Sequence, residues 1–138
     1  MLRRSLLAVA LGALSFSCAG LDRAEECRQV ATVVNPILAT IDHSRAVVKA
    51  PTYRLIATKY EELANATGLV KIRNKHVSEA VNDYQRMLHE AARDARAFGD
   101  ALEANDESRL LLARTTAART VRHEATALAR MDNACRGR

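Results

Sequence analysis

The chain has 138 residues, enough for one domain with a hydrophobic core of its own. Two prolines, five glycines and abundant alanine favour an all-helical chain. The net charge of +5 is mild and falls by two when residues 1–17, which contain Arg3 and Arg4, are removed. Such a balance does not indicate a nucleic-acid-binding protein, so we expect no nucleic acid among its partners.

The first residues have the order of an export signal. Two arginines precede an apolar run from Leu6 to Leu14, and the small-residue stretch 15–17 leads to Cys18. The run is about ten residues long, whereas a membrane-spanning helix needs roughly 20. No later stretch without a charge approaches that length. We therefore predict a signal peptide over residues 1–17 and no transmembrane helix.

The segment Leu14-Ser15-Phe16-Ser17-Cys18 resembles the lipobox of bacterial lipoproteins. The resemblance implies that a diacylglycerol is attached to the thiol of Cys18 and that the preceding peptide is removed. It also implies an outer-membrane protein facing the periplasm, because Ala19 and Gly20 follow in place of the Asp that retains many Gram-negative lipoproteins in the inner membrane. Residues 18–23 then form a lipidated tether and residues 24–138 the folded domain.

An ordinary exported protein is the alternative. Ser15 and Phe16 stand where lipoboxes usually carry Leu and a small residue, and Ser15-Phe16-Ser17 also suits the general signal peptidase. The product would then be secreted or soluble in the periplasm. Arg3-Arg4-Ser5-Leu6-Leu7 further resembles a twin-arginine export signal.

The three cysteines support lipidation independently of the lipobox. Disulfides form in exported proteins, and if Cys18 carries lipid, Cys27 and Cys135 remain as a pair. Without lipid, one thiol would need a partner on another chain. In the chain-entropy model a bridge from Cys27 to Cys135 contributes about 4 to 5 kcal/mol, because it closes almost the whole mature chain.

The first predicted helix has its apolar residues at steps of three and four, which places them on one face. They are Cys27, Val30, Val34, Ile37, Ile41 and Val48. Pro36 lies inside this helix and removes one backbone hydrogen bond. It should bend the helix near Asn35 without necessarily ending it.

The second predicted helix begins at Pro51, because proline suits the first helical position. Gly68 follows Asn65-Ala66-Thr67 and is the expected end of this helix. Its apolar face consists of Tyr53, Ile56, Tyr60 and Leu63.

The third predicted helix shows a strict alternation of four and three residues. Its apolar face consists of Val77, Val81, Tyr84, Leu88, Ala91, Ala95, Phe98 and Leu102. Asn105 and Asp106 supply the turn and the cap before the last helix, and Gly137 ends that helix. The predicted apolar face of the last helix consists of Leu110, Leu111, Ala118, Val121, Ala125, Leu128, Met131 and Cys135.

Four amphipathic helices joined by short turns predict an all-α fold, an antiparallel up-down four-helix bundle. This topology places Cys27 and Cys135 at the same end, in agreement with the expected disulfide. The alternation also continues in phase over residues 53–77, so three helices with one long central helix are the alternative. A loop in that region is favoured by Gly68 and by the basic residues Lys71, Arg73 and Lys75.

No motif of catalysis, cofactor binding or metal binding emerges. A nucleophile elbow and a glycine-rich phosphate loop are both missing from the sequence. The histidines lie beside the apolar stripes, without the E-x-x-H pairs of di-iron bundles. We therefore expect no enzyme activity, no cofactor and no metal. The histidines are His43, His76, His89 and His123.

Two features carry a functional hypothesis. The aromatic residues of the predicted core, Tyr53, Tyr60, Tyr84 and Phe98, are interpreted as packing, with a small apolar pocket between the second and third helices as the functional alternative. The arginines of the last helix form a possible interaction face for anionic headgroups or an acidic protein, or else a solvated surface balanced by neighbouring acids. They are Arg114, Arg119, Arg122 and Arg130.

The sequence therefore favours a membrane-anchored extracytoplasmic lipoprotein, a helical bundle with a non-enzymatic structural or protein-interaction role. Its expected partners are the membrane, through the lipid, and a protein of unknown identity. The alternative is a periplasmic bundle that binds a small ligand in its core.

Overall fold

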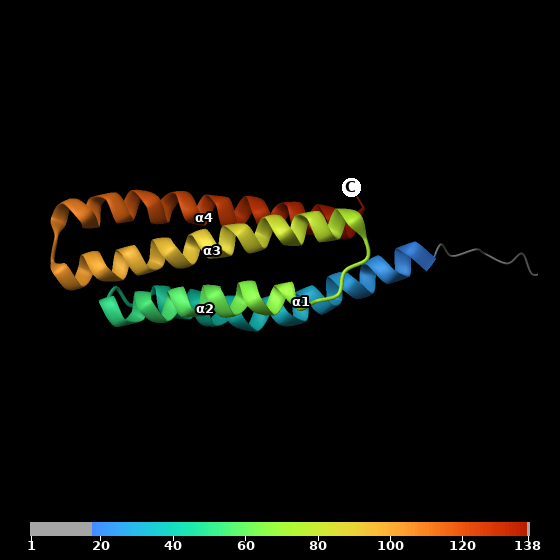
Figure 1. Cartoon of the computed structure of the whole chain (residues 1–138), viewed down its shortest axis with the longest axis horizontal. Helices are drawn as coiled ribbons and strands as arrows, with labels where there is room; N and C mark the ends of the chain where they lie inside the picture. The colour runs from blue at the N-terminus through green and yellow to red at the C-terminus, as the bar shows by residue number, and fades with distance from the viewer. Residues whose placement is uncertain (1–17, 138) are drawn as a thin grey trace, which may run out of the picture.

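A computed structural model describes residues 18–137 of the chain. It contains the helices α1 (Cys18–Arg45), α2 (Ala50–Gly68), α3 (Lys75–Ala104) and α4 (Glu107–Arg136). Successive helices run in opposite directions, so the all-α, antiparallel up-down four-helix bundle is confirmed (Figure 1). The predicted signal peptide lies outside the described residues. Residues 18–23, assigned to the tether, form the first turns of α1.

The helical conformation is interrupted between α2 and α3, which excludes the alternative of one long central helix. The backbone N–H groups of Leu69 and Val70 donate to the carbonyls of Ala66 and Thr67, and these bonds end α2 after Gly68. A new helix starts where the side chain of Asn74 accepts a hydrogen bond from the N–H of Val77.

The other helix ends also follow their local sequence. Pro51 lies in the first turn of α2, Asn105 adopts the left-handed conformation after α3, and the carboxylate of Asp106 caps α4 by accepting from the N–H of Arg109. Gly137 ends α4 with a φ of 72°, a conformation that suits glycine.

The first helix departs from its prediction at one end. It continues through Pro36 but ends at Arg45, so Val48 does not belong to its apolar face. Val47 and Val48 lie exposed in the turn that reverses the chain before α2.

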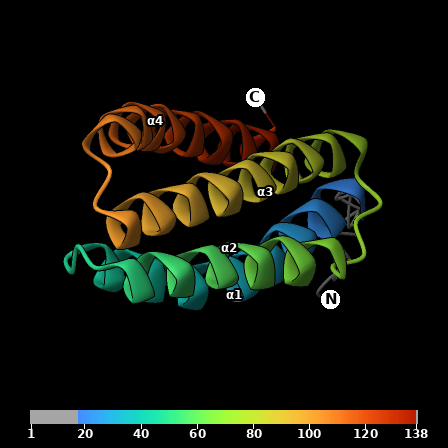
Figure 2. The ribbon, with the colours of Figure 1, turned by 60° about the vertical axis from the view of Figure 1, so that its left-hand side comes forward.

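The core is centred on α2 and α3. The predicted face of α3 is buried from Val77 to Phe98, and Leu102 at its end is half-buried. α1 packs mainly against α2 and α4 against α3, while α1 and α4 scarcely touch. Figures 1 and 2 show these two helix pairs side by side. The buried apolar side chains of the described residues all lie between Val30 and Ala134, so a chain that begins at Ala19 contains every one of them.

The predicted apolar face of α4 was correct for Met131, which is buried, and for Leu128, which packs against the core, but wrong for four of its other residues. Leu111 is 69% exposed and Val121 is 50% exposed, and Ala118 and Ala125 are exposed as well. Small side chains allow α4 to approach the alanines of α3 closely, so they occupy the interface in place of the larger aliphatic ones. The residues that α4 buries are Ala113, Glu124, Ala127, Met131 and Ala134.

The disulfide forms between Cys27 and Cys135, as the sequence predicted. The two Cα atoms are 5.9 Å apart, and the bridge joins α1 to α4 at the end where the chain termini of the bundle meet. Glu26, the residue before Cys27, is only 6% exposed and accepts hydrogen bonds from the backbone N–H groups of Arg73 and Asn74. This end of the bundle is therefore tied together by both a covalent and a polar link.

Candidate functional site

An apolar cleft of about 140 Å³ opens between α2, α3 and α4 in the half of the bundle away from the disulfide. It lies beside Tyr53 and Tyr60, between the second and third helices, which is the place of the small apolar pocket that the sequence offers as an alternative. Residues of α4 form one further wall. The cleft is open because α1 covers α2 and leaves this side of α4 uncovered. Its lining consists of Arg45, Tyr53, Ile56, Tyr60, Ala91, Asp94, Ala95, Phe98, Ala117, Thr120 and Val121.

One wall is an aromatic pair. The rings of Tyr53 and Phe98 have centroids 4.3 Å apart and are tilted by 39°. Gly99 allows α2 and α3 to approach closely at this point, because a Cβ atom there would lie 3.2 Å from the carbonyl oxygen of Ala50. The wall is therefore set by helix packing and does not depend on a flexible loop.

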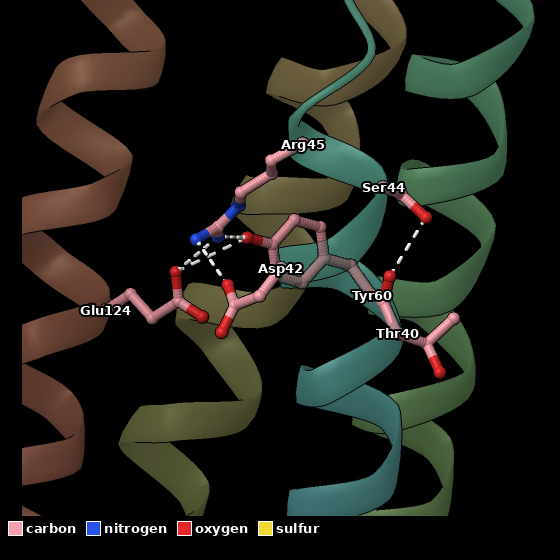
Figure 3. Close-up of polar contacts among 6 residues, drawn as sticks. All are labelled: Thr40, Asp42, Ser44, Arg45, Tyr60 and Glu124. Atoms are coloured by element: carbon pink, nitrogen blue, oxygen red, sulfur yellow. Dashed lines mark hydrogen bonds and ion pairs between the residues drawn. The ribbon is translucent and has the colours of Figure 1, made fainter.

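A polar cluster borders the cleft, where α1, α2 and α4 come together (Figure 3). The guanidinium of Arg45 lies 2.7 Å from the carboxylate of Glu124 and 3.0 Å from that of Asp42. It also donates to the hydroxyl of Tyr60, which in turn donates to Glu124 over 3.3 Å. Glu124 is only 6% exposed, so Arg45 supplies the counter-charge that its burial requires.

The pKa values of this cluster follow from burial and charge. Burial by itself would lower the pKa of Arg45, but its hydrogen bond with Glu124 and the charges around it raise the pKa above its usual value. Burial and the charge of Glu124 raise the pKa of Tyr60 to about 12. Arg45 therefore stays charged and Tyr60 stays protonated at physiological pH, which suits recognition and positioning better than proton transfer.

Tyr84 lies deeper and has an unsatisfied hydroxyl. Its side chain is fully buried, and its oxygen has no hydrogen-bond partner among the described residues. Burial, followed by the charge of Glu124, raises the pKa of Tyr84. The hydroxyl of Tyr84 is therefore a buried polar group in the core, whereas the lining of the cleft is mostly apolar.

The predicted arginine face is exposed but does not form one cluster. Arg130 lies beside α3 and pairs with Asp83 over 3.6 Å. This pair agrees with the alternative of a solvated surface that is balanced by neighbouring acids. Arg114, Arg119 and Arg122 form no ion pair within the described part of the chain. Of these three, Arg114 lies on the side of the cleft, because it is three residues before Ala117. Arg119, two residues after Ala117, faces away from it.

The remaining predicted residues lie apart from the cleft. Cys18 begins α1, but its side chain is outside the described part, so its lipidation stays a prediction. Among the described side chains, no three His, Cys, Asp or Glu residues group as metal ligands would. None of the helices over residues 18–137 is long and apolar enough to cross a membrane. The exposed histidines are His43, His76, His89 and His123.

The sequence interpretation missed the buried acids Glu26 and Glu124 and the half-buried Arg45. A signal for Glu124 does exist, because the small residues of α4 recur at steps of four and three and Glu124 falls in that series. The series consists of Ala113, Ala117, Thr120, Glu124, Ala127, Met131 and Ala134. Glu26 and Arg45 have a similar signal, because they lie four residues before Val30 and four residues after Ile41 and so extend the apolar series of the first helix, although their partners are distant in the sequence.

Comparison of the chain with protein-family models, with curated proteins and with solved structures found no match.

Proposed function

We propose that this protein is a lipid-anchored, extracytoplasmic helical bundle that acts by binding a protein partner in the apolar cleft between α2, α3 and α4. The observation that carries the proposal is the uncovered apolar lining of the cleft. Its volume of about 140 Å³ is below the roughly 300 Å³ at which small-molecule pockets begin. A single apolar side chain of a partner, inserted as an anchor, suits a cleft of this size.

The surface around the cleft extends the apolar contact. Val121 is half exposed at its edge, and Ala118 and Ala125 continue the uncovered side of α4. Apolar side chains that line up along a helix favour a second helix as the partner element. An amphipathic helix of the partner could then lie along α4 with its anchor residue in the cleft.

The charged residues around the cleft indicate which charge the partner should carry. Arg114 lies one helical turn before Ala117 of the lining and has no ion-pair partner among the described residues. Of the charged residues in the lining, Arg45 is already neutralised by Glu124, and Asp94 accepts a hydrogen bond from Thr120. A partner with an acidic side chain next to its apolar anchor would complement this rim. A second copy of α4 would instead bring arginine against arginine, so the proposal is a different, acidic protein.

The lipid anchor is supported by the cysteine count. Because Cys27 and Cys135 pair with each other, Cys18 is the cysteine left for a diacylglycerol. Intact mass of the membrane-extracted protein tests this part of the proposal. A mass equal to the chain from Cys18 onward plus a diacylglycerol and an acyl group is expected, and a soluble chain without the adduct would contradict the anchor.

A small apolar ligand is the second candidate. The lining of the cleft is almost entirely apolar on α2 and α3, and it includes Tyr53, Ile56 and Phe98. A thermal shift with an extracted lipid or other small apolar compound, abolished by Val121→Arg, would favour this candidate over a protein partner.

Site-specific photo-crosslinking in cells tests the protein partner. A photo-reactive phenylalanine at Val121 is expected to form one discrete protein adduct, and the same group at Arg119, on the opposite side of α4, is expected to form none. The Val121 adduct should disappear with Arg114→Glu and persist with Arg122→Glu. An adduct that is insensitive to Arg114→Glu, or equal at both positions, would contradict the proposed cleft partner.

A further inference from the structure

We propose that the α2–α3 loop, residues 69–74, together with Lys75 at the start of α3, is a second membrane contact that lays one end of the bundle on anionic lipid headgroups. This inference goes beyond the lipid anchor and the cleft, and it does not depend on acylation of Cys18. It is carried by the alternation of the loop, by its rigid attachment to α1 and by its unneutralised charges.

The loop alternates between inward apolar and outward basic residues. Val70 and Ile72 are half-buried and pack against the core. The residues that alternate with these two point outward: Leu69 is 83% exposed, and Lys71 and Arg73 are exposed as well. An exposed large apolar side chain flanked by basic ones is the composition of a surface that lies at a membrane interface.

The conformation of the loop is held in place. The carboxylate of Glu26 accepts from the N–H of Arg73 over 2.7 Å and from the N–H of Asn74 over 3.1 Å. Val70 and Ile72 fix the other side by packing. Leu69 is therefore presented to the outside by an ordered loop and cannot fold back into the core without loss of these contacts.

The basic charges of the loop are not neutralised within the bundle. Lys71 and Arg73 form no ion pair in the part of the chain that the structure describes, and Lys75 approaches Glu79 only to 3.8 Å. Glu26, the nearest buried acid, is occupied by the loop backbone. These charges remain available for an external anion.

The opposite end of the bundle differs in this respect. There, Arg54 pairs with Asp100 and Glu103, and Arg109 pairs with Asp106. Arg54 and Arg109 are thus neutralised, whereas Lys71 and Arg73 of the α2–α3 loop have no ion-pair partner among the described residues.

The loop lies at the end where the lipid would be. Figures 1 and 2 place it beside the N-terminal half of α1, whose first turns extend past it in Figure 1, at the end of the bundle where α4 ends. Cys18 and Glu26 are separated along α1 by roughly 12 Å. This is slightly more than the Debye length of about 8 to 10 Å, so an anchor at Cys18 would hold the loop near the outer part of the electrostatic field of the headgroups.

Vesicle sedimentation of an unlipidated chain, Ala19–Arg138, tests the inference, since this chain contains every buried apolar side chain of the described residues. The chain is expected to bind phosphatidylcholine vesicles that contain phosphatidylglycerol, and to bind pure phosphatidylcholine vesicles far more weakly. Lys71→Gln with Arg73→Gln should weaken binding roughly thirtyfold, since each basic residue near the surface contributes about 1 kcal/mol. Leu69→Ser should weaken it by about tenfold.

The matched control is Arg119→Gln with Arg122→Gln, which removes two exposed charges from α4. It should leave vesicle binding unchanged. Absence of binding to anionic vesicles, equal binding to neutral ones, or an equal loss in the control would overturn the inference, and the last result would assign the contact to α4. Circular dichroism confirms that each variant is folded. Failure here leaves the cleft proposal intact, because the cleft lies in the other half of the bundle.

Discussion

Arg45 at the end of α1 and Glu124 in α4 form an ion pair 2.7 Å long that bridges two helices which otherwise scarcely touch. The disulfide between Cys27 and Cys135 joins the same helices at the other end. These two links hold α1 and α4 in position on either side of the core, and the cleft opens beside the first of them. The width of the cleft therefore depends on a polar contact between residues 79 positions apart in the sequence.

Replacement of Glu124 by Ala should destabilise the protein by about 2 to 3 kcal/mol, because it leaves Arg45 and Tyr60 without their buried partner. Urea denaturation measures the loss. Asp42→Ala removes an exposed partner of the same arginine and should cost less than about 1 kcal/mol. An equal loss of unfolding free energy in both variants would contradict the prediction that the buried partner of Arg45 stabilises the protein more than the exposed one.

Two tyrosines in the core should respond in opposite ways to the loss of their hydroxyls. Tyr60→Phe removes a bonded hydroxyl and should cost about 1 kcal/mol. Tyr84→Phe removes a buried hydroxyl without a described partner and should be neutral or stabilising by up to about 1 kcal/mol. Thermal and urea unfolding of both variants check the prediction, which fails if Tyr84→Phe is the more damaging change.

The raised pKa of Tyr60 predicts a loss of stability in alkali. The folded value of about 12 lies above the ordinary value of 10, so the folded state holds this proton more tightly than the unfolded state. The resulting stabilisation is complete below pH 10 and is lost as the pH rises toward 12. Unfolding free energies measured across this range should fall less steeply for Tyr60→Phe than for the unmodified protein. Identical slopes would show that Tyr60 ionises equally easily in both states.

Glu26 should stabilise the end of the bundle through the two backbone groups that it accepts from. Glu26→Ala leaves the N–H groups of Arg73 and Asn74 without their acceptor and should cost about 2 to 3 kcal/mol. Glu25→Ala removes a neighbouring exposed carboxylate that pairs with Arg28 and should cost under about 1 kcal/mol. Hydrogen exchange of the loop amides should accelerate only in the Glu26 variant, and unchanged exchange there would contradict the tie between α1 and the loop.

Local sequence determined where α2 and α4 begin and end. Pro51, Gly68, Asp106 and Gly137 act on the backbone within one turn of themselves, so their effect needs no knowledge of the fold. The strict apolar period of α3 likewise identified its buried face, because large aliphatic and aromatic residues there coincide with the core. Cysteine parity predicted the pairing of Cys27 with Cys135 on the expectation that Cys18 carries lipid.

Only the tertiary structure decided which side of α4 is buried and what lies uncovered. Alanine gives a weak hydrophobic signal in a sequence, yet its small size lets α4 approach α3, and this turned Leu111 and Val121 toward solvent. The cleft and the pairing of Arg45 with Glu124 depend on that rotation. The sequence by itself therefore determined the helices and their order, which follow from interactions within a few residues. The site depended on packing between distant helices, where the fit of small side chains outweighs the hydrophobicity of each residue.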